Sequence, residues 1–340
     1  MDCHLLSHGI SIEKDIICDC CLKRGENDGK PFLIDIRDNF VDWTELFKRK
    51  INFKKTKIED EKYCKGCLGL EDKDFNDGEY ISYINFNHWN RCNSKCIYCC
   101  DEFNGGNNYF NVLPIIKDLI ESGYFKNNGE ITFQGGEPTI LPEFEDLLEL
   151  FIKEKSKIRI HSSGIKYSEA IEKALSKGLV TVVISPDSGN PETYRRIKTV
   201  PCFDRVWQNI KNYAASQNEP DKVKVKYIII PGINDYVDEV DKWFEKCLET
   251  HINNIIIDVE FRFASENNYK IPHVCMLIDY IIFKAEQLNL KHEFYNGAFY
   301  ADKEREFPEL SSEIMKNKSV FLDKYSELQE KYKFQNLIYK

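Results

Sequence analysis

Four cysteines stand within ten residues at positions 91–100, where the sequence reads RCNSKCIYCC. Cys92, Cys96 and Cys99 follow CxxxCxxC spacing, which lets one short loop place three thiolates around a single metal centre. Closed zinc and cluster sites usually take four protein ligands, so three cysteines would leave one coordination position for another molecule. Cys100 could be the fourth ligand, but adjacent side chains usually diverge, and we interpret it as a packing residue. The spacing alone leaves zinc, an electron-transfer cluster, a disulfide and a reactive cofactor open.

Composition restricts what can surround this loop. The 340 residues allow one large domain plus a smaller module. The chain has 47 Lys and Arg against 56 Asp and Glu, and its formal charge of -9 would repel a phosphate backbone, so we expect no nucleic-acid partner. No export signal is evident, nor an apolar run of the ~20 residues that a bilayer span needs. We therefore expect a cytoplasmic protein without a membrane partner, in which the 13 cysteines stay reduced and available to metals.

Six short β-rich runs alternate with amphipathic helical patterns from about residue 80 onward. The runs cover residues 80–86, 130–133, 157–161, 180–185, 223–230 and 254–261. Repeated strand–helix units predict a parallel sheet with right-handed crossovers. Six units are too few for the eight-unit closed barrel, so we predict an α/β fold with a partial (β/α)6 barrel over residues 80–264. The site is expected at the carboxyl ends of the strands, where the loops converge.

The flanking regions have a different character. Residues 1–79 contain cysteines and few apolar stretches, which predicts a small metal-stapled module, and residues 265–340 predict a helical C-terminal extension. Five cysteines make a second candidate metal group in the N-terminal region: Cys18, Cys20, Cys21, Cys64 and Cys67. Zinc, an auxiliary iron-sulfur cluster and unligated thiols all stay open for this group, and His4 or His8 could replace one cysteine ligand.

The segment CNSKCIYC resembles the cluster loop of the radical S-adenosylmethionine (radical SAM) enzymes, CxxxCxΦC, with Tyr98 in the aromatic position. Its place directly after the first expected barrel strand strengthens the match. The resemblance implies a [4Fe-4S] cluster on Cys92, Cys96 and Cys99 whose fourth iron chelates the amino and carboxylate groups of S-adenosylmethionine (SAM). It also implies reductive cleavage of SAM to methionine and a 5'-deoxyadenosyl radical, with the electron from a flavodoxin- or ferredoxin-type reductant.

Motifs at the next two strand ends fit the same resemblance. FQGGEP at residues 133–138 resembles the family's GGEP motif, which makes Gly135, Gly136 and Glu137 contacts to the methionine amino group. Adjacent glycines let the backbone approach a ligand that a Cβ would exclude, although a double glycine is ordinarily a bare turn. The third strand ends in HSSG where many relatives have Thr-Asn-Gly, so Ser163 stands at the Asn position and could bond ribose or carboxylate.

The fourth strand ends in SPDSG, which resembles the family's Ser-x-Asp signature. Ser185 and Asp187 are therefore candidate ribose or methionine contacts, although the same residues could form a turn that caps the next helix. In this family a basic residue after the fourth strand commonly pairs with the methionine carboxylate. Lys198 matches that position best, and Arg195 and Arg196 are near enough to compete.

The fifth strand ends in IPGIND, which resembles the family's IPGxND ending and implies that Ile233 and Asn234 approach the adenine. The Pro-Gly part of this match is common in turns. The resemblance extends over roughly residues 81–262, with the motifs in the family's order. Several ordered matches make an accidental one improbable.

Charged residues repeat along two expected strands. Alternate residues of a barrel strand face inward, so Asp258, Glu260 and Arg262 share one face, and Lys224 and Lys226 share a face of the preceding strand. Charges on a buried strand need partners or ligands. They could form an internal network of salt bridges, or bind a polar substrate such as a nucleotide, a sugar derivative or a peptide side chain.

We predict a radical SAM enzyme that abstracts hydrogen from a polar small-molecule or peptide substrate. The alternative is a non-catalytic zinc or iron-sulfur scaffold or an electron-transfer protein, which would have four protein ligands at each metal and no SAM site. A radical SAM enzyme that acts on RNA is disfavoured by the acidic balance of the chain.

Overall fold

The structure of the chain is a computed structural model. It describes residues 2–18, 32–36, 38–57, 70–75, 78–99, 110–260, 272–294 and 318–331. The chain divides into two units. The first unit contains Met1–Asn93 and Asp101–His161, and the second contains Ser94–Cys100 and Ser162–Lys340.

All six predicted barrel strands are present: β4 (Ile81–Phe86), β5 (Phe125–Phe133), β6 (Lys157–Ser162), β7 (Val180–Ile184), β8 (Val223–Ile229) and β9 (Asn254–Val259). The pairings β4–β5 and β5–β6 in the first unit are parallel, and so are β7–β8 and β8–β9 in the second. Every residue of β9 is buried, as expected for a parallel strand covered on both faces.

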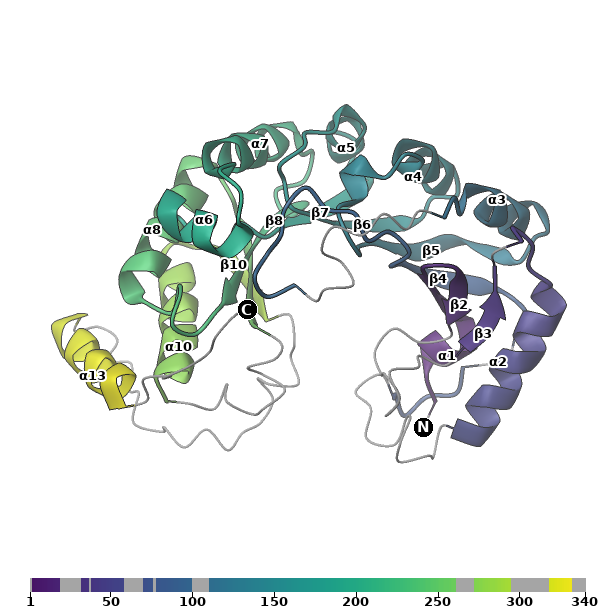
Figure 1. The fold of residues 1–340 in the computed structure, drawn as a ribbon, viewed down its shortest axis with the longest axis horizontal. Coiled ribbons are helices and arrows are strands. Elements are labelled where there is room, and N and C mark those ends of the chain that lie inside the picture. Colours follow the sequence, from purple (N-terminus) through teal and green to yellow (C-terminus); the bar gives the residue numbers. More distant parts are fainter. Residues whose placement is uncertain are drawn as a thin grey trace. The chain divides into compact units, whose positions relative to one another are not determined.

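The predicted amphipathic patterns form helices because their apolar residues, three and four positions apart, bury one face of each helix. These helices are α3 (Leu113–Glu121), α4 (Phe144–Lys153), α5 (Glu169–Leu175), α7 (Phe203–Ser216), α8 (Val237–Glu249), α10 (Pro272–Gln287) and α13 (Lys318–Lys331). Figure 1 colours them along the sequence. Among the helices in the described ranges, none combines the length and the apolar character that a bilayer span requires.

The first unit contains three strands that the sequence did not predict. They are β1 (Gly9–Glu13), β2 (Ile16–Cys18) and β3 (Phe32–Asp35), and the strand order within the unit is β3-β2-β1-β4-β5-β6. β1 pairs with β4 in parallel and with β2 in antiparallel fashion. The described part of residues 1–79 lies in the same unit as β4, β5 and most of β6, and the predicted N-terminal module stays a prediction. Strands of three to five residues are too short for periodicity to reveal them.

Two helices flank these N-terminal strands: α1 (His4–His8) and α2 (Trp43–Lys57). The two histidines of α1 contact the first residues of β4 and the residue before it. The His8 ring stacks on Tyr80 with 4.0 Å between ring centroids, and His4 Nε2 lies 3.1 Å from Ser82 Oγ. Burial lowers the pKa of both histidines from the usual 6.5. These packing contacts give each imidazole a structural role in α1.

We expect the protein to lose stability as the pH falls below about 6.5. The unfolded chain would protonate His4 and His8 at higher pH than the folded chain does, so acidification favours unfolding. Thermal unfolding at about pH 7.5 and about pH 5.5 checks this, with His8→Phe as the matched variant that can keep the ring on Tyr80 but cannot titrate. An equal pH dependence in His8→Phe and the wild type would contradict a contribution from His8.

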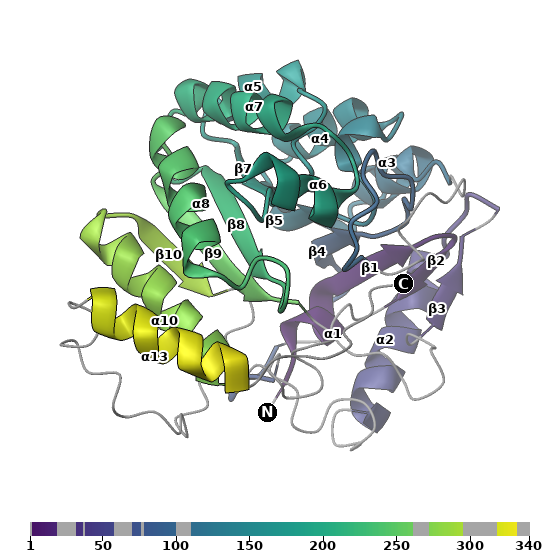
Figure 2. The same cartoon turned by 60° about the vertical axis from the view of Figure 1, so that its left-hand side comes forward.

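The second unit has the strand order β7-β8-β9-β10, and β10 (Lys291–Phe294) is parallel to β9. The sequence did not predict β10, because the four-residue run KHEF is short and mostly polar. The C-terminal helices α10 and α13 lie side by side (Figure 2), and the rings of Tyr280 and Phe321 stack with centroids 5.1 Å apart. The two helical segments predicted in the C-terminal extension are therefore confirmed where the structure describes them.

Candidate functional site

The GGEP turn after β5 holds the chain that leads to Cys92. Two main-chain bonds do this within the first unit: Gly136 N–H donates to Trp89 O at 2.6 Å, and Glu137 N–H donates to Arg91 O at 2.9 Å. They continue the pairing of β4 with β5 beyond the ends of both strands. The stem of the cysteine loop is thereby fixed by the motif that the sequence resemblance connected with the methionine group.

Both positions of this motif require glycine, because the backbone of the turn lies very close to the backbone of residues 89–91. A Cβ on Gly136 would lie 2.2 Å from Arg91 O, and a Cβ on Gly135 would lie 2.7 Å from Trp89 O. Gly135 also has φ of +92°, a conformation that residues with a Cβ rarely adopt. The partner that a Cβ would exclude here is the stem of the cysteine loop, and the contact of these glycines with the methionine amino group stays a prediction.

Glu137 is 1% exposed and stabilises the same turn. Its Oε1 accepts hydrogen bonds from Thr139 N–H at 3.1 Å and Thr139 Oγ1 at 2.6 Å. It caps the short 3-10 helix η2 (Pro138–Ile140), where Pro138 already fixes the first φ. A buried carboxylate bonded in this way orients the turn that holds the cysteine loop, and its contact with the methionine amino group stays a prediction.

The three loop cysteines are reduced and half-buried. Cys92 belongs to the first unit, and Cys96 and Cys99 belong to the second. Within the second unit, Cys99 N–H donates to Cys96 O at 3.0 Å, and Cys96 Sγ lies 3.4 Å from Ser94 Oγ. By residue type, three thiols suit an iron-sulfur cluster with one open iron, but within the described residues the structure does not gather any three His, Cys, Asp or Glu side chains into a metal site. Cys100 lies outside the described residues.

The second half of the loop is held by α6 (Pro191–Lys198), a helix that the sequence analysis did not predict. Lys95 N–H donates to Lys198 O at 3.2 Å, and Ile97 N–H donates to Ile197 O at 3.0 Å. Asn190 caps the helix and Pro191 occupies its first turn, a start signature that could have revealed it. The C-terminal end of α6 therefore positions residues 95–97.

Glu239, on α8, fixes the other end of α6. Its carboxylate accepts hydrogen bonds from Ser188 Oγ, Asn190 Nδ2 and Thr193 Oγ1 at 3.1, 3.2 and 2.9 Å. The side chain is only 9% exposed, so these bonds replace the water that a buried carboxylate would lose. Sequence patterns could not reveal Glu239 as a positioning residue, because its three partners lie about fifty residues away.

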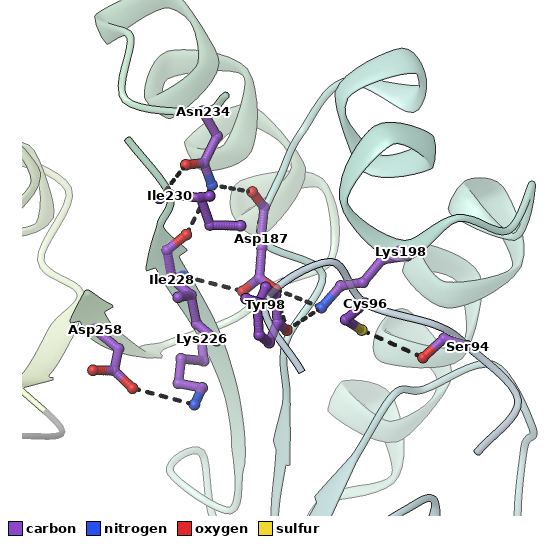
Figure 3. A network of polar contacts seen from close by, with 10 residues as sticks. All are labelled: Ser94, Cys96, Tyr98, Asp187, Lys198, Lys226, Ile228, Ile230, Asn234 and Asp258. Carbon is purple, nitrogen blue, oxygen red and sulfur yellow. Dashed lines mark hydrogen bonds and ion pairs between the residues drawn. The ribbon is translucent and has the colours of Figure 1, made fainter. Parts of the chain in front are cut away.

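Tyr98, Asp187 and Lys198 form a hydrogen-bonded triad in which Tyr98 is half-buried and the other two residues are buried (Figure 3). Tyr98 OH donates to Asp187 Oδ2 at 2.7 Å, and Lys198 Nζ donates to both Asp187 Oδ2 and Tyr98 OH, at 2.5 and 2.6 Å. Asp187 is 0% and Lys198 4% exposed. Burial, with the negative charge of Asp187 and then Cys96 nearby, raises the pKa of Tyr98 well above its usual value, so the phenol stays protonated and can donate. Lys198 is thus ion-paired with a protein carboxylate.

Asp187 and Asn234 also bond main-chain groups (Figure 3). Asp187 Oδ1 accepts from Ile228 N–H at 3.0 Å, and Asp187 O accepts from Asn234 Nδ2 at 2.8 Å. Asn234 Oδ1 accepts from Ile230 N–H at 2.6 Å, and its Nδ2 also donates to Ile228 O at 2.8 Å. Asp187 adopts φ of +57°, a left-handed conformation that Asp tolerates better than most residues. These contacts join the Ser-x-Asp and IPGxND motifs.

The other predicted cofactor contacts are more accessible. Ser163 Oγ accepts from Ile165 N–H at 3.3 Å, and both Ser163 and Ser185 are half-buried. Arg195 and Arg196 are exposed. Apolar side chains gather beside the triad: Ile97, Tyr98 and Ile233 pack on Ile197, Ile228 and Ile230. Ile233 and Tyr98 therefore pack against the same apolar cluster.

The charges predicted on neighbouring strands face each other. Lys226 Nζ on β8 lies 3.4 Å from Asp258 Oδ2 on β9, and Lys224 pairs with Glu293 on β10. Burial raises the pKa of Asp258, and Lys226 partly opposes this shift. Glu260 is 1% exposed, directly after β9. The internal network that the sequence left open is thus present in the described residues, while Arg262 lies outside them.

Of the second cysteine group, only Cys18 lies within the described residues, where it is fully buried in β2. Cys20, Cys21, Cys64 and Cys67 lie outside them. The ligation of a second metal by this group stays a prediction.

Comparison with known proteins identifies the region that carries these motifs. The model of the radical SAM superfamily matches residues 86–246. GTP 3',8-cyclase from Petrotoga mobilis is 31% identical over 167 residues, which cover 46% of this chain and 50% of the cyclase. Molybdenum cofactor biosynthesis protein 1 from Dictyostelium discoideum is 31% identical over 183 residues, covering 52% of this chain and 28% of that protein. The chain thus spans half or less of the length of these relatives.

A solved structure shows the same fold. SuiB from Streptococcus suis, bound to its precursor peptide SuiA, aligns with 86% of this chain and 74% of its own, at a TM-score of 0.52 and 16% sequence identity. The predicted fold class, an α/β radical SAM fold with largely parallel strands, is therefore confirmed. Membership of this superfamily implies a [4Fe-4S] cluster and SAM. The matched region, residues 86–246, contains the cysteine loop and all four motifs after it, so this region of the chain is a radical SAM region.

Proposed function

We propose that the chain binds a [4Fe-4S] cluster through Cys92, Cys96 and Cys99 and binds SAM at the open iron. When bound, the cluster supplies the electron that cleaves SAM into methionine and a 5'-deoxyadenosyl radical, which abstracts hydrogen from the substrate. The observation that supports this most directly is the donor set: three reduced, half-buried cysteines in one loop within the matched region.

The residues around the loop would orient the cofactors. The turn at Gly135–Glu137 holds the stem that ends at Cys92, and the end of α6 holds the segment before Cys96 and Cys99. We assign SAM contacts to the accessible groups among the predicted residues, namely the hydroxyls of Ser163 and Ser185 and the chain at Ile233. Contacts of the glycine turn with the methionine amino group belong to the same proposal.

The substrate is proposed to be polar and charged. Lys226 and Asp258 place both signs of charge on one face of β8 and β9, and Glu260 follows directly. A nucleotide, a sugar derivative or a peptide each carries polar or charged groups that could bond Lys226 or Asp258 in place of their bond to each other. The names of the relatives include a GTP cyclase and a protein bound to a peptide, which agrees with a polar substrate of either kind.

A second metal is proposed for the N-terminal cysteines. Cys18 stands at the end of β2, and four further cysteines lie nearby in the sequence or in the CxxC pair at residues 64–67. Zinc and an auxiliary iron-sulfur cluster are both compatible with such a group. A flavodoxin- or ferredoxin-type protein is the proposed source of electrons.

The function is tested by anaerobic purification, reconstitution with iron and sulfide, reduction with dithionite, and chromatography of 5'-deoxyadenosine made from added SAM. We expect the wild type to form this product and Cys92→Ala to form none. Cys202→Ala is the matched control, because Cys202 is a half-buried cysteine beside α7, outside the loop, and its loss should leave product formation within about twofold of the wild type. Metal analysis of the same samples reports zinc.

The scaffold or electron-carrier alternative predicts a different result. A protein with a full cluster, no 5'-deoxyadenosine and no spectral change on addition of SAM would exclude the proposed function and favour that alternative. Product from Cys92→Ala at the wild-type rate would show that the cluster is held elsewhere.

A further inference from the structure

A continuous hydrogen-bonded network joins the cysteine loop to the IPGIND turn within the second unit. We propose that Asp187 and Lys198 are positioning residues that couple the loop, residues 94–99, to the turn, residues 230–235. They would do so through Tyr98 on one side and Asn234 on the other. The consequence for SAM rests on the proposed function, whereas the coupling itself is a property of the chain and can be measured separately.

The network begins in the loop. Tyr98 is held there by neighbours whose main-chain amides are bonded to α6, through Lys95 and Ile97. Its hydroxyl accepts from Lys198 and donates to Asp187 at 2.6 and 2.7 Å. Lys198 bonds to the loop twice, through its carbonyl oxygen to Lys95 N–H and through its ammonium group to Tyr98 OH. The end of α6 and the loop are therefore joined by hydrogen bonds from one residue.

Asp187 is the centre of the network. Its Oδ2 accepts from Tyr98 and Lys198, its Oδ1 accepts from Ile228 N–H, and its carbonyl oxygen accepts from Asn234 Nδ2. All four bonds are internal, and the residue is 0% exposed. A carboxylate with both oxygens bonded inside the protein is suited to holding parts of the fold in place, and ribose would have to displace one of these partners.

Asn234 transmits the position of Asp187 to the turn. It caps the end of β8 by bonding both Ile228 O and Ile230 N–H, at 2.8 and 2.6 Å. Its own carbonyl oxygen accepts from Tyr227 OH at 2.6 Å. Asn234 is 0% exposed, so a movement of its amide cannot be compensated by water. The conformation of the turn therefore depends on the place of Asp187, and through it on Tyr98.

Coupling explains why the predicted cofactor residues fall into two groups. Ser163, Ser185 and Ile233 are accessible, whereas Asp187, Lys198 and Asn234 are buried and bonded to one another. In the proposed enzyme, the loop would hold the cluster and the turn would meet the adenine. A fixed link between them would keep both ends of one SAM molecule in register.

Amide hydrogen exchange on the full chain, purified anaerobically, tests the coupling. Tyr98→Phe removes one hydroxyl and keeps the ring. We expect exchange about tenfold faster at Ile97 in the loop and also at Ile228 and Ile230, whose amides bond Asp187 and Asn234. Tyr280→Phe is the matched control, since it removes the hydroxyl bond to Asp241 elsewhere in the same unit and should leave these three amides unchanged. Faster exchange confined to residues 94–99 would overturn the proposal.

Equilibrium binding of SAM to the cluster-loaded chain supplies a second readout. We expect Tyr98→Phe and Lys198→Met each to raise the Kd for SAM about tenfold. The Kd of the double variant should not exceed the higher of the two single-variant values, because both substitutions act through Asp187. Losses that multiply in the double variant would show two independent contacts with SAM and overturn the positioning role. If the wild type binds no SAM, the proposed function fails, and the exchange experiment still decides the coupling.

Discussion

Gly136→Ala is expected to reduce 5'-deoxyadenosine formation at least about a hundredfold and to leave the chain with little reconstituted iron. The added methyl group would lie 2.2 Å from Arg91 O and 2.8 Å from Arg91 C, well inside the 3.0 Å that Cβ atoms keep from other heavy atoms. Both contacts are backbone atoms, so no side chain can turn away. The turn or the stem of the cysteine loop must move, and Cys92 is the next residue of that stem.

Gly123→Ala separates this steric effect from the conformational cost of losing a glycine. Gly123 lies in the same unit with φ of +76°, and its Cβ would have nothing within 4 Å. We expect a loss of stability of about 1–2 kcal/mol, from strain alone, and normal iron content. Iron per chain, circular dichroism and product formation are measured for both variants. Wild-type iron and product in Gly136→Ala would show that the approach of Arg91 to this turn is not needed.

Lys198→Met is expected to lower the free energy of unfolding by about 3 kcal/mol, the largest stability effect that we predict for a single side chain. The substitution preserves most of the volume of the side chain and removes its charge, which leaves Asp187 buried at 0% exposure without its cation. An uncompensated carboxylate in such a place costs several kcal/mol. Denaturant unfolding of the full chain measures the effect.

The double variant Asp187→Asn/Lys198→Met tests whether charge is the reason. Asn tolerates the left-handed φ of Asp187 and can keep a bond to Ile228 N–H, and the double variant buries no net charge. We expect its stability to return to within about 1 kcal/mol of the wild type. A double variant as unstable as Lys198→Met would show that packing of the lysine stem, and not the ion pair, stabilises this region.

Periodicity in the sequence was sufficient for the strands and helices of the matched region. The alternation of apolar runs with amphipathic patterns predicted all six strands from β4 to β9, because each buries a long enough apolar stretch to show its period. It was insufficient for β1 to β3 and β10, which are short and gain stability from pairing with neighbours. The N-terminal module expected over residues 1–79 stays a prediction.

Motif order determined the family and located the cysteine loop, since residue type and spacing are properties of the chain itself. The spacing of Cys92, Cys96 and Cys99 left several chemistries open, and the motifs that follow it in order favoured a cluster with an open position. The roles of the buried polar residues could not be read in this way. Asp187 and Lys198 matched cofactor-binding positions of the family. A motif match does not say whether such a side chain bonds the cofactor or another protein group.

The tertiary structure decided those roles. Tyr98 and Lys198 are a hundred residues apart in sequence, and their bond exists only because α6 packs its C-terminal end against the loop. The free energy of burying a charge depends on the partners that folding brings within about 3 Å, and those partners come from distant elements. The sequence by itself therefore determined the family resemblance, the barrel strands and the candidate cysteine loop, while only the fold decided which of the predicted polar residues stay accessible and which are buried and bonded to one another.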